Sequence, residues 1–414
     1  MEAGGETTEV MVGRQPIYDH RMNVRAYELL FREAGASQAN VVDGNHATSQ
    51  VLYNTFIEIG LDSIVGRHKA FVNLTPAFLM GEYPLPKSSG NLVLEILEDI
   101  EPTPELVESI RKLREQGYTI ALDDFVYSPH LQPLVDLANI IKIDITQMDE
   151  AGLAEHVQRL RRDDQLLLAE KVETYGEFEY CQHLGFDLYQ GYFFCRPNII
   201  KGKHLPTNRL ALMQLLSELQ REEADIGKLE QLISQDVTLS YRLIRLINSA
   251  AFALSTRVES ISRALMLLGL DAVRNWASLL ALSNIDDKPM ELVRNSAVRA
   301  RMAELVGGVV DSGVDPGTYF TAGLFSNLDA LVDKSMDAIL DELPLSEQVC
   351  EALLTGQGSV GVVLQVVLAY EQAEWEDLER LNTGIPLSTL RQHYLEAIGW
   401  ADSLVSEVVE GKAA

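Results

Sequence analysis

The first half of the chain alternates short apolar runs with segments of helical period. The apolar runs span residues 71–74, 92–97, 119–122, 140–145, 166–169 and 188–194, and residues 105–116 and 154–162 between them show helical spacing. Strands that are apolar on both faces and separated by helices are typical of a mainly parallel sheet covered by helices. Six such units in about 200 residues predict an α/β barrel or a doubly wound sheet, and periodicity does not distinguish the two.

The second half follows a different pattern, because strand-like runs largely disappear after about residue 208. Helical patterns cover residues 209–220, 226–235, 238–248, 262–268, 272–283, 291–310, 319–326 and 387–409. Turn sequences such as Asp315-Pro316-Gly317 separate several of them. We therefore predict an α/β domain over residues 1–204 and an all-helical domain over residues 205–414.

Charge and composition restrict the classes of partner. The 414 residues carry a net charge of −27, which argues against binding a nucleic-acid backbone. The three cysteines lack metal-site spacing and predict reduced thiols in the cytoplasm. Residues 1–10 are polar and acidic, and no apolar run reaches the roughly 18–20 residues of a membrane span. We expect a cytoplasmic protein without a membrane partner.

Potential ligand residues recur within or just after the predicted strands. They are Glu28 near the start, Asn73 and Lys142 inside apolar runs, and Glu95, Asp123, Asp124, Glu170 and Glu173 at or after the ends of runs. In a barrel such positions converge on one mouth, where carboxylate and amide oxygens suit Mg²⁺ or Mn²⁺. A single acidic residue after a strand is more often a helix cap or a solvated side chain. Recurrence over five strands favours a metal site that could polarise a phosphodiester.

Two stretches near the start carry a family resemblance. They are Arg14-Gln15-Pro16-Ile17-Tyr18 and Tyr27-Glu28-Leu29-Leu30-Phe31-Arg32, which includes the signature Glu-x-Leu-x-Arg. With the acidic positions above, the chain resembles EAL-domain cyclic-di-GMP phosphodiesterases in which an HDOD domain follows the EAL domain (the YuxH-like proteins). The resemblance covers essentially the whole chain. It implies a modified (β/α)8 TIM-like barrel with an antiparallel first strand, followed by an all-α HDOD domain.

The resemblance also implies a metal site, with Mg²⁺ or Mn²⁺ as cofactor. The family's ligands fall on Glu28, Asn73, Glu95 and Asp123, and Asp124 would serve a second metal. The implied reaction opens cyclic di-GMP to linear pGpG by attack of a metal-activated water.

The other site roles come from the same resemblance. Arg32 would contact a phosphate of the ligand, and Gln190 would complete the binding site. Lys142 would hold the catalytic water or the scissile phosphate. Glu170 would be the general base, with Glu173 in support.

Two departures from the family pattern leave two interpretations open. The family places a Gly-rich loop, which couples dimerisation to metal binding, where this chain has Val126-Tyr127-Ser128-Pro129 after Asp123-Asp124-Phe125. Lys171 replaces a usual glycine, whereas Glu98, the anchor of the loop in the family, is retained. The protein is then either a phosphodiesterase or a non-catalytic cyclic-di-GMP receptor or scaffold. The resemblance allows a homodimer through this loop.

The helical half lacks the residues of an HD-type metal centre. Only one histidine, His393, lies beyond residue 204, so a multi-histidine site cannot form there. Asn295, Ser326 and Asn327 stand where the resemblance would place metal ligands. We expect a regulatory or output module that contacts protein partners and performs no chemistry of its own.

Overall fold

The computed structural model describes residues 10–33, 60–85, 89–98, 100–196, 207–221, 226–235, 237–248, 258, 260–283, 285, 288–310, 313–381 and 383–413. The chain divides into two compact units. The first comprises Met1–Phe193, Tyr370–Glu376 and Pro386–Arg391, and the second comprises Phe194–Ala369, Asp377–Ile385 and Gln392–Ala414. The predicted boundary between residues 204 and 205 lies outside the described residues and stays a prediction.

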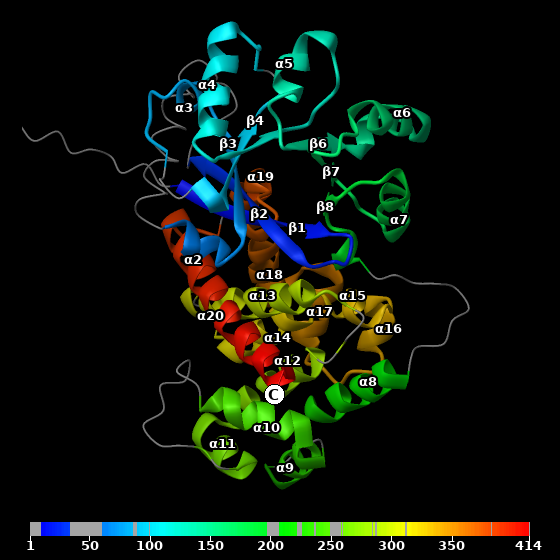
Figure 1. The fold of residues 1–414 in the computed structure, drawn as a ribbon. Helices are drawn as coiled ribbons and strands as arrows, with labels where there is room; N and C mark the ends of the chain where they lie inside the picture. Colours follow the sequence, from blue (N-terminus) through cyan, green and yellow to red (C-terminus); the bar gives the residue numbers. More distant parts are fainter. Residues whose placement is uncertain are drawn as a thin grey trace, which may run out of the picture. The chain divides into compact units, whose positions relative to one another are not determined.

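The first unit is a closed barrel of eight strands in chain order (Figure 1). The strands are β1 (Val10–Asp19), β2 (Val24–Glu33), β3 (Lys69–Leu74), β4 (Leu92–Ile96), β5 (Thr119–Leu122), β6 (Ile140–Asp144), β7 (Leu166–Glu170) and β8 (Leu188–Gln190). Strands β2 to β8 are parallel to one another, whereas β1 is antiparallel to both β2 and β8. The predicted barrel with an antiparallel first strand is therefore confirmed, and a doubly wound sheet is excluded.

A tight turn makes the antiparallel start of the barrel. The Asp19 carboxylate accepts hydrogen bonds from the backbone N–H groups of Arg21, at 2.8 Å, and Asn23, at 3.0 Å. Met22 between them has a φ of 64°, in the left-handed region. An aspartate that accepts from the backbone two residues ahead is a common way to reverse the chain. This turn brings β2 back along β1 without a helical crossover.

An apolar layer fills one level of the barrel interior, and every strand contributes one residue to it. The layer consists of Ile17, Ala26, Phe71, Val93, Ala121, Ile140 and Leu168, with Leu188 packed against it. Side chains two residues apart on a strand point to the same face. The residues two positions from these, toward the carboxyl ends of the parallel strands, therefore form the next interior level.

Helices of the first unit lie outside the strands (Figure 1). They are α2 (Leu61–Val65), α3 (Pro76–Leu79), α4 (Pro104–Glu115), α5 (Gln132–Val135), α6 (Glu150–Leu160) and α7 (Tyr175–Leu184), with 3-10 turns at Ser89–Asn91, Pro129–Leu131, Ile145–Gln147 and Phe193–Cys195. Helix α7 begins with a capping box in which Thr174 and Glu177 bond each other's backbone N–H groups. This cap fixes the chain just after β7, where the mouth of the barrel lies.

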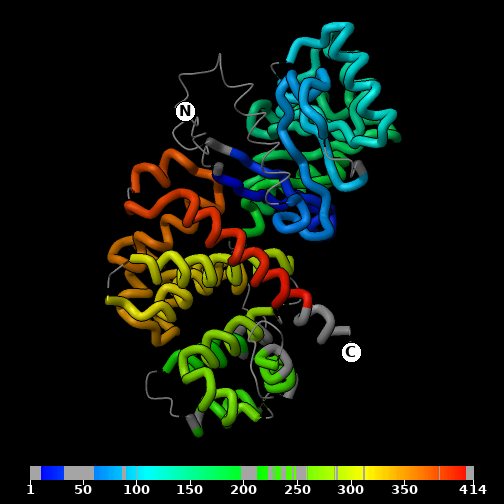
Figure 2. Tube along the Cα trace, turned by 90° about the vertical axis from the view of Figure 1, so that its left-hand side faces the viewer, coloured from blue at the N-terminus to red at the C-terminus, as the bar shows by residue number. Residues whose placement is uncertain are grey.

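The second unit is helical in its described residues. Its elements, some of which share segments with the first unit, are α8 (Thr207–Leu219), α9 (Ile226–Gln235), α10 (Val237–Ile247), α11 (Ile261–Leu268), α12 (Leu270–Leu282), α13 (Met290–Val309), α14 (Pro316–Phe325), α15 (Leu328–Val332), α16 (Met336–Leu340), α17 (Glu347–Thr355), α18 (Gly358–Glu371), α19 (Trp375–Leu381) and α20 (Leu387–Ala413). Helices α9, α10 and α11 contact one another, and Figure 2 shows them in light green toward the bottom of the view. Helix α13 packs along α14.

No single helix among the described residues is long and apolar enough to cross a membrane. The bent pair of α17 and α18 would be, by length and composition alone.

Candidate functional site

A polar layer lies directly on the apolar layer of the barrel. Each of its members stands two positions from the apolar-layer residue of the same strand. The members are Gln15, Glu28, Asn73, Glu95, Asp123, Lys142, Glu170 and Gln190, one for each strand or its immediate end. The strand register therefore brings together seven of the residues expected at the site. Gln15 is the eighth, which the sequence analysis did not select as a site residue.

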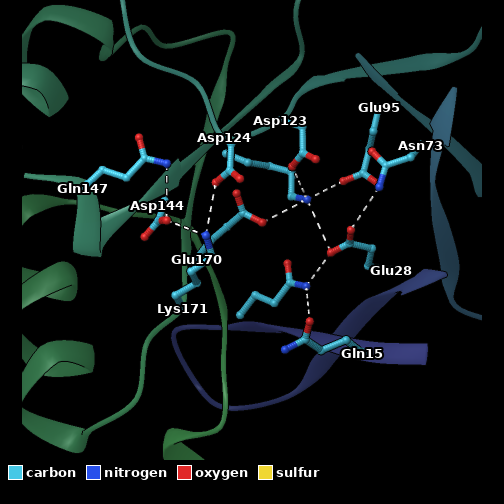
Figure 3. Close-up of polar contacts among 12 residues, drawn as sticks. Gln15, Glu28, Asn73, Glu95, Asp123, Asp124, Asp144, Gln147, Glu170 and Lys171 are labelled. Atoms are coloured by element: carbon cyan, nitrogen blue, oxygen red, sulfur yellow. Dashed lines mark hydrogen bonds and ion pairs between the residues drawn. The ribbon is translucent and has the colours of Figure 1, made fainter. Parts of the chain in front are cut away.

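Lys142 lies at the centre of this layer, in contact with four carboxylates that Figure 3 labels. Its ammonium lies 2.6 Å from Glu95 Oε1, 2.6 Å from Asp123 Oδ1, 3.0 Å from Glu170 Oε1 and 3.4 Å from Glu28 Oε2. Its side chain is completely buried, as is that of Glu95. A single ammonium therefore stands among four carboxylates that are largely withdrawn from water.

Amide side chains orient one carboxylate of the cluster. Asn73 Nδ2 donates to Glu28 Oε1 at 3.4 Å, and Gln190 Nε2 donates to Glu28 Oε2 at 2.5 Å. Gln190 Nε2 also lies 2.9 Å from the side-chain oxygen of Gln15, which accepts a hydrogen bond from it. Glu28 is thus fixed from both sides, with its two oxygens facing the centre of the barrel.

Burial and mutual repulsion alter the ionisation of these groups. Burial, with the charge of Glu28, raises the pKa of Glu95 well above its ordinary value despite the attraction of Lys142. Burial likewise raises the pKa of Glu170 to about 8. Burial alone would lower the pKa of Lys142, but the surrounding carboxylates, Glu28 foremost, raise it well above its ordinary value. The lysine is therefore charged, and the carboxylates need a further proton or cation.

The donor set fits a divalent cation. Glu28, Glu95 and Asp123 each offer a carboxylate oxygen, and these atoms lie within 4.8 Å of one another. Asn73 Oδ1 and Glu95 Oε2 are buried acceptors without a hydrogen-bond partner. Buried polar atoms are nearly always satisfied in native proteins, so such acceptors call for a missing donor or ion. Carboxylate and amide oxygens are the ligands that Mg²⁺ and Mn²⁺ prefer.

A second, smaller ionic group lies beside the first (Figure 3). Lys171 Nζ is 2.5 Å from Asp144 Oδ2 and 3.8 Å from Asp124 Oδ1. Burial would raise the pKa of Asp144, but hydrogen bonds from Lys171 and Thr146 hold it below its ordinary value. Burial raises the pKa of Asp124 despite Lys171. From the sequence, Lys171 stands out only as the replacement of a glycine, and no role is expected for Asp144.

The other residues expected at the site lie away from the Lys142 cluster or have side chains outside the described residues. Arg32 pairs with Met11 in the β1–β2 ladder, and its side chain lies outside the described residues. Glu98 is exposed, and its charge contributes to the raised pKa of Asp124. Glu173 is exposed, and its backbone N–H donates to Glu177. The roles expected for these three residues stay predictions.

The loop after Phe125 is held by specific contacts. The Phe125 backbone N–H donates to the carbonyl of Lys142 at 2.9 Å. The Tyr127 hydroxyl donates to Gln132 Oε1 at 3.0 Å, and the Arg159 guanidinium lies 4.1 Å from the centre of the Tyr127 ring. The segment that replaces the family's Gly-rich loop is therefore anchored to α5 and α6.

In the helical unit, an arginine faces the positions where the resemblance would place metal ligands. Arg299 of α13 is 3% exposed, and its guanidinium donates to Ser326 Oγ at 3.2 Å and to Asn327 Oδ1 at 2.5 Å. Asn295 is half-buried on the same helix. The guanidinium thus supplies a cationic partner to the two residues that join α14 to α15.

Comparisons with known proteins bear on both units. The EAL domain model matches residues 57–197, and the HDOD domain model matches residues 205–340. Protein YuxH of Bacillus subtilis (strain 168) is 34% identical over 405 residues, which cover 96% of this chain and 99% of YuxH. The cyclic di-GMP phosphodiesterase CdgJ of Vibrio cholerae is 36% identical over 400 residues, covering 95% of this chain and 92% of CdgJ.

A solved structure also resembles part of the chain. The calcium and cyclic-di-GMP complex of Klebsiella pneumoniae BlrP1 is 22% identical, with a TM-score of 0.38 over 45% of this chain and 55% of that one. The identities of 34% to YuxH and 36% to CdgJ extend over nearly the full length of the chain and show its family. The chain belongs to the EAL–HDOD (YuxH-like) family.

Proposed function

We propose that the barrel is a metal-dependent phosphodiesterase that opens cyclic di-GMP to linear pGpG. The main observation that supports this function is the cluster of Glu28, Glu95 and Asp123 at the mouth of the barrel. The buried Oδ1 of Asn73, which has no hydrogen-bond partner, lies beside it. A divalent ion held there would polarise a phosphate oxygen and make an attacking water easier to deprotonate. The kinship with CdgJ supports cyclic di-GMP as the substrate.

The chain's own residues would divide the remaining work. Glu170 would take the proton of the attacking water, since Oε2 of its carboxylate is buried without a hydrogen-bond partner. Its pKa near 8 lies close to the operating range of an efficient general base. Lys142 lies 3.0 Å from Glu170 and would hold the water or the scissile phosphate in line with it. Arg32 and Glu173 keep the roles that the resemblance implies.

The direct test incubates the full chain with cyclic di-GMP and Mg²⁺ or Mn²⁺, and follows pGpG by chromatography. Product should form with the wild type and with Glu115→Ala, an exposed carboxylate on α4. It should be lost in Glu28→Ala and Asp123→Ala. Glu170→Ala should lower turnover roughly 10²–10⁴-fold while nucleotide binding, titrated in Ca²⁺, persists. Wild-type turnover in all three site variants would refute the assignment.

The anchored loop after Phe125 favours a second candidate, a receptor that binds cyclic di-GMP without hydrolysing it. Tyr127 fixes this loop to α5 and Phe125 fixes its start to Lys142 of β6, which limits the movement that assembly of an active site would need. Binding in Ca²⁺ without pGpG in Mg²⁺ or Mn²⁺ would establish this receptor role. Absence of both binding and product would leave the barrel as a protein-interaction scaffold.

A further inference from the structure

The carboxylates at the mouth of the barrel form two groups with different charge balances. In the first, Lys142 faces the carboxylates of Glu28, Glu95, Asp123 and Glu170, so one ammonium meets four acids. In the second, Lys171 forms ion pairs with Asp124 and Asp144 among the described residues, and the charge of Glu170 also acts on it. The first group therefore needs more added positive charge than the second.

Each carboxylate oxygen of Asp144 already accepts two hydrogen bonds. Its Oδ1 accepts from the Thr146 N–H at 2.8 Å and from the Thr146 hydroxyl at 2.6 Å. Its Oδ2 accepts from Lys171 at 2.5 Å and from Gln147 Nε2 at 3.4 Å. Each carboxylate oxygen has about two lone-pair directions, so these four donors fill the acceptor capacity of Asp144. Asp144 therefore binds the Lys171 ammonium and has no free lone pair for a metal ion.

Asp124 shows the opposite condition. Its Oδ1 is buried without a hydrogen-bond partner, and the Lys171 ammonium lies 3.8 Å from it. The carboxylates of Asp123, Asp144 and Glu98 add negative charge around Asp124. A divalent ion takes carboxylate oxygens at about 2.0–2.2 Å, so an ion on this oxygen would lie within about 6 Å of the ammonium. The Lys171 side chain is 54% exposed and that of Asp124 is 30% exposed. Two positive charges at that distance repel each other, and solvent weakens the repulsion. Lys171 and a metal ion therefore compete for Asp124.

The backbone shows that Lys171 is held in this position against its conformational preference. Its φ is 56°, in the left-handed region that glycine adopts without cost and other residues rarely occupy. Asp124, which faces it, also has a left-handed φ, of 41°. Strained backbone of this kind persists only where surrounding structure enforces it, and it clusters at functional sites.

We infer that Lys171 is a built-in cation in the place of a second divalent ion, so that the barrel binds one ion at Glu28, Glu95 and Asp123. Among the described residues, these three form the group of carboxylates close enough to share an ion. The inference rests on the proposed function only in treating the mouth as a metal site. It makes Lys171 a positioning residue that sets metal stoichiometry and leaves Asp124 paired with an ammonium.

The test is the number of Mn²⁺ ions bound by the EDTA-stripped full chain, measured by equilibrium dialysis and calorimetric titration. The wild type should bind about one ion per chain, and both Lys171→Met and Lys171→Gly should bind about two. Lys112→Met, which removes an exposed lysine on α4, should still bind one. The methionine variant removes the charge and keeps the strained backbone, whereas the glycine variant removes both.

Each outcome separates this inference from the proposed function. Two ions in the wild type, or one ion in both Lys171 variants, would overturn the inference and leave hydrolysis possible. A second ion in Lys171→Gly alone would show that backbone geometry and not charge excludes it, which also overturns the inference. One ion in the wild type without pGpG would sustain the inference and refute the enzyme. No bound ion would refute both.

Discussion

The Lys142 ammonium lies 2.6 Å from Glu95 Oε1, and both side chains are completely removed from solvent. A buried charge pair is tolerated only where each charge has close partners, because desolvation of an unpaired charge is costly. Lys142 meets this condition through three further carboxylates, whereas Glu95 keeps an oxygen without a donor. The pair is thus half of an ionic arrangement that a divalent cation would complete.

Removing the Lys142 ammonium should lower the free energy of unfolding of the metal-free barrel. In Lys142→Met the four carboxylates lose their shared positive partner, and breaking a buried pair in this way costs about 3–5 kcal/mol. The loss should be larger at pH 8 than at pH 5, because at low pH the carboxylates take up protons instead. Denaturant melts in EDTA measure this, with Lys112→Met expected within about 0.5 kcal/mol of wild type. Equal stability of both variants would contradict the central role of Lys142.

The raised pKa of Glu170 predicts how stability depends on pH without metal. The native carboxyl titrates at about 8, against an ordinary value near 4.5. Between these values the native state holds a proton that the unfolded chain has released, so stability falls as pH rises through this window. Glu170→Gln cannot release that proton and should flatten the curve. Melting temperatures in EDTA from pH 5 to 8.5 test this, and parallel curves for the two proteins would show that Glu170 does not titrate there.

The fold was predictable from the sequence where strands are buried on both faces. The continuous apolar runs predicted strands β3 to β7 with bounds within about two residues of those observed. These strands are buried on both faces, so their sequences are apolar throughout and easy to recognise. Strands β1 and β2 mix polar and apolar residues, so periodicity missed them and only the family resemblance supplied the antiparallel start. In the second unit, helices α15 to α19 were not predicted as elements. The last strand was predicted as 188–194, but β8 ends at Gln190.

The site was predictable in its residue types and not in its pairings. The polar residues at the strand ends predicted most members of the polar layer, because the carboxyl ends of parallel barrel strands meet at one mouth. Gln15 was missed since its strand runs the other way, and its place becomes clear only through the two-residue spacing from Ile17 in the closed barrel. The pairing of Lys171 with Asp144 depends on a left-handed backbone that the sequence alone did not predict for a lysine.

Gly191 should be among the least replaceable residues of the barrel. A Cβ there would lie 2.0 Å from the backbone oxygen of Val172, because Val172 bonds both Gln190 and Phe193 across this point. Gly191→Ala should therefore cost about 3 kcal/mol or more and displace Gln190 from Glu28. Gly185→Ala is the matched control: its φ is 91° with open space around it, so only about 1 kcal/mol is expected. Equal losses in chemical melts would show that the contact with Val172 can relax.

In the helical unit, Arg299→Met should destabilise the packing of α13 against the start of α15. The guanidinium donates to Ser326 Oγ and Asn327 Oδ1, and Asn327 is 2% exposed. Removing this donor leaves a buried acceptor unpaired, which costs about 1–3 kcal/mol. The change should lower the stability of the second unit and leave Mn²⁺ binding by the barrel intact. Arg263→Met on α11 removes an exposed arginine and is the control. Hydrogen exchange resolved by segment measures both, and unchanged protection of α13 in Arg299→Met would mean that Ser326 and Asn327 find other partners.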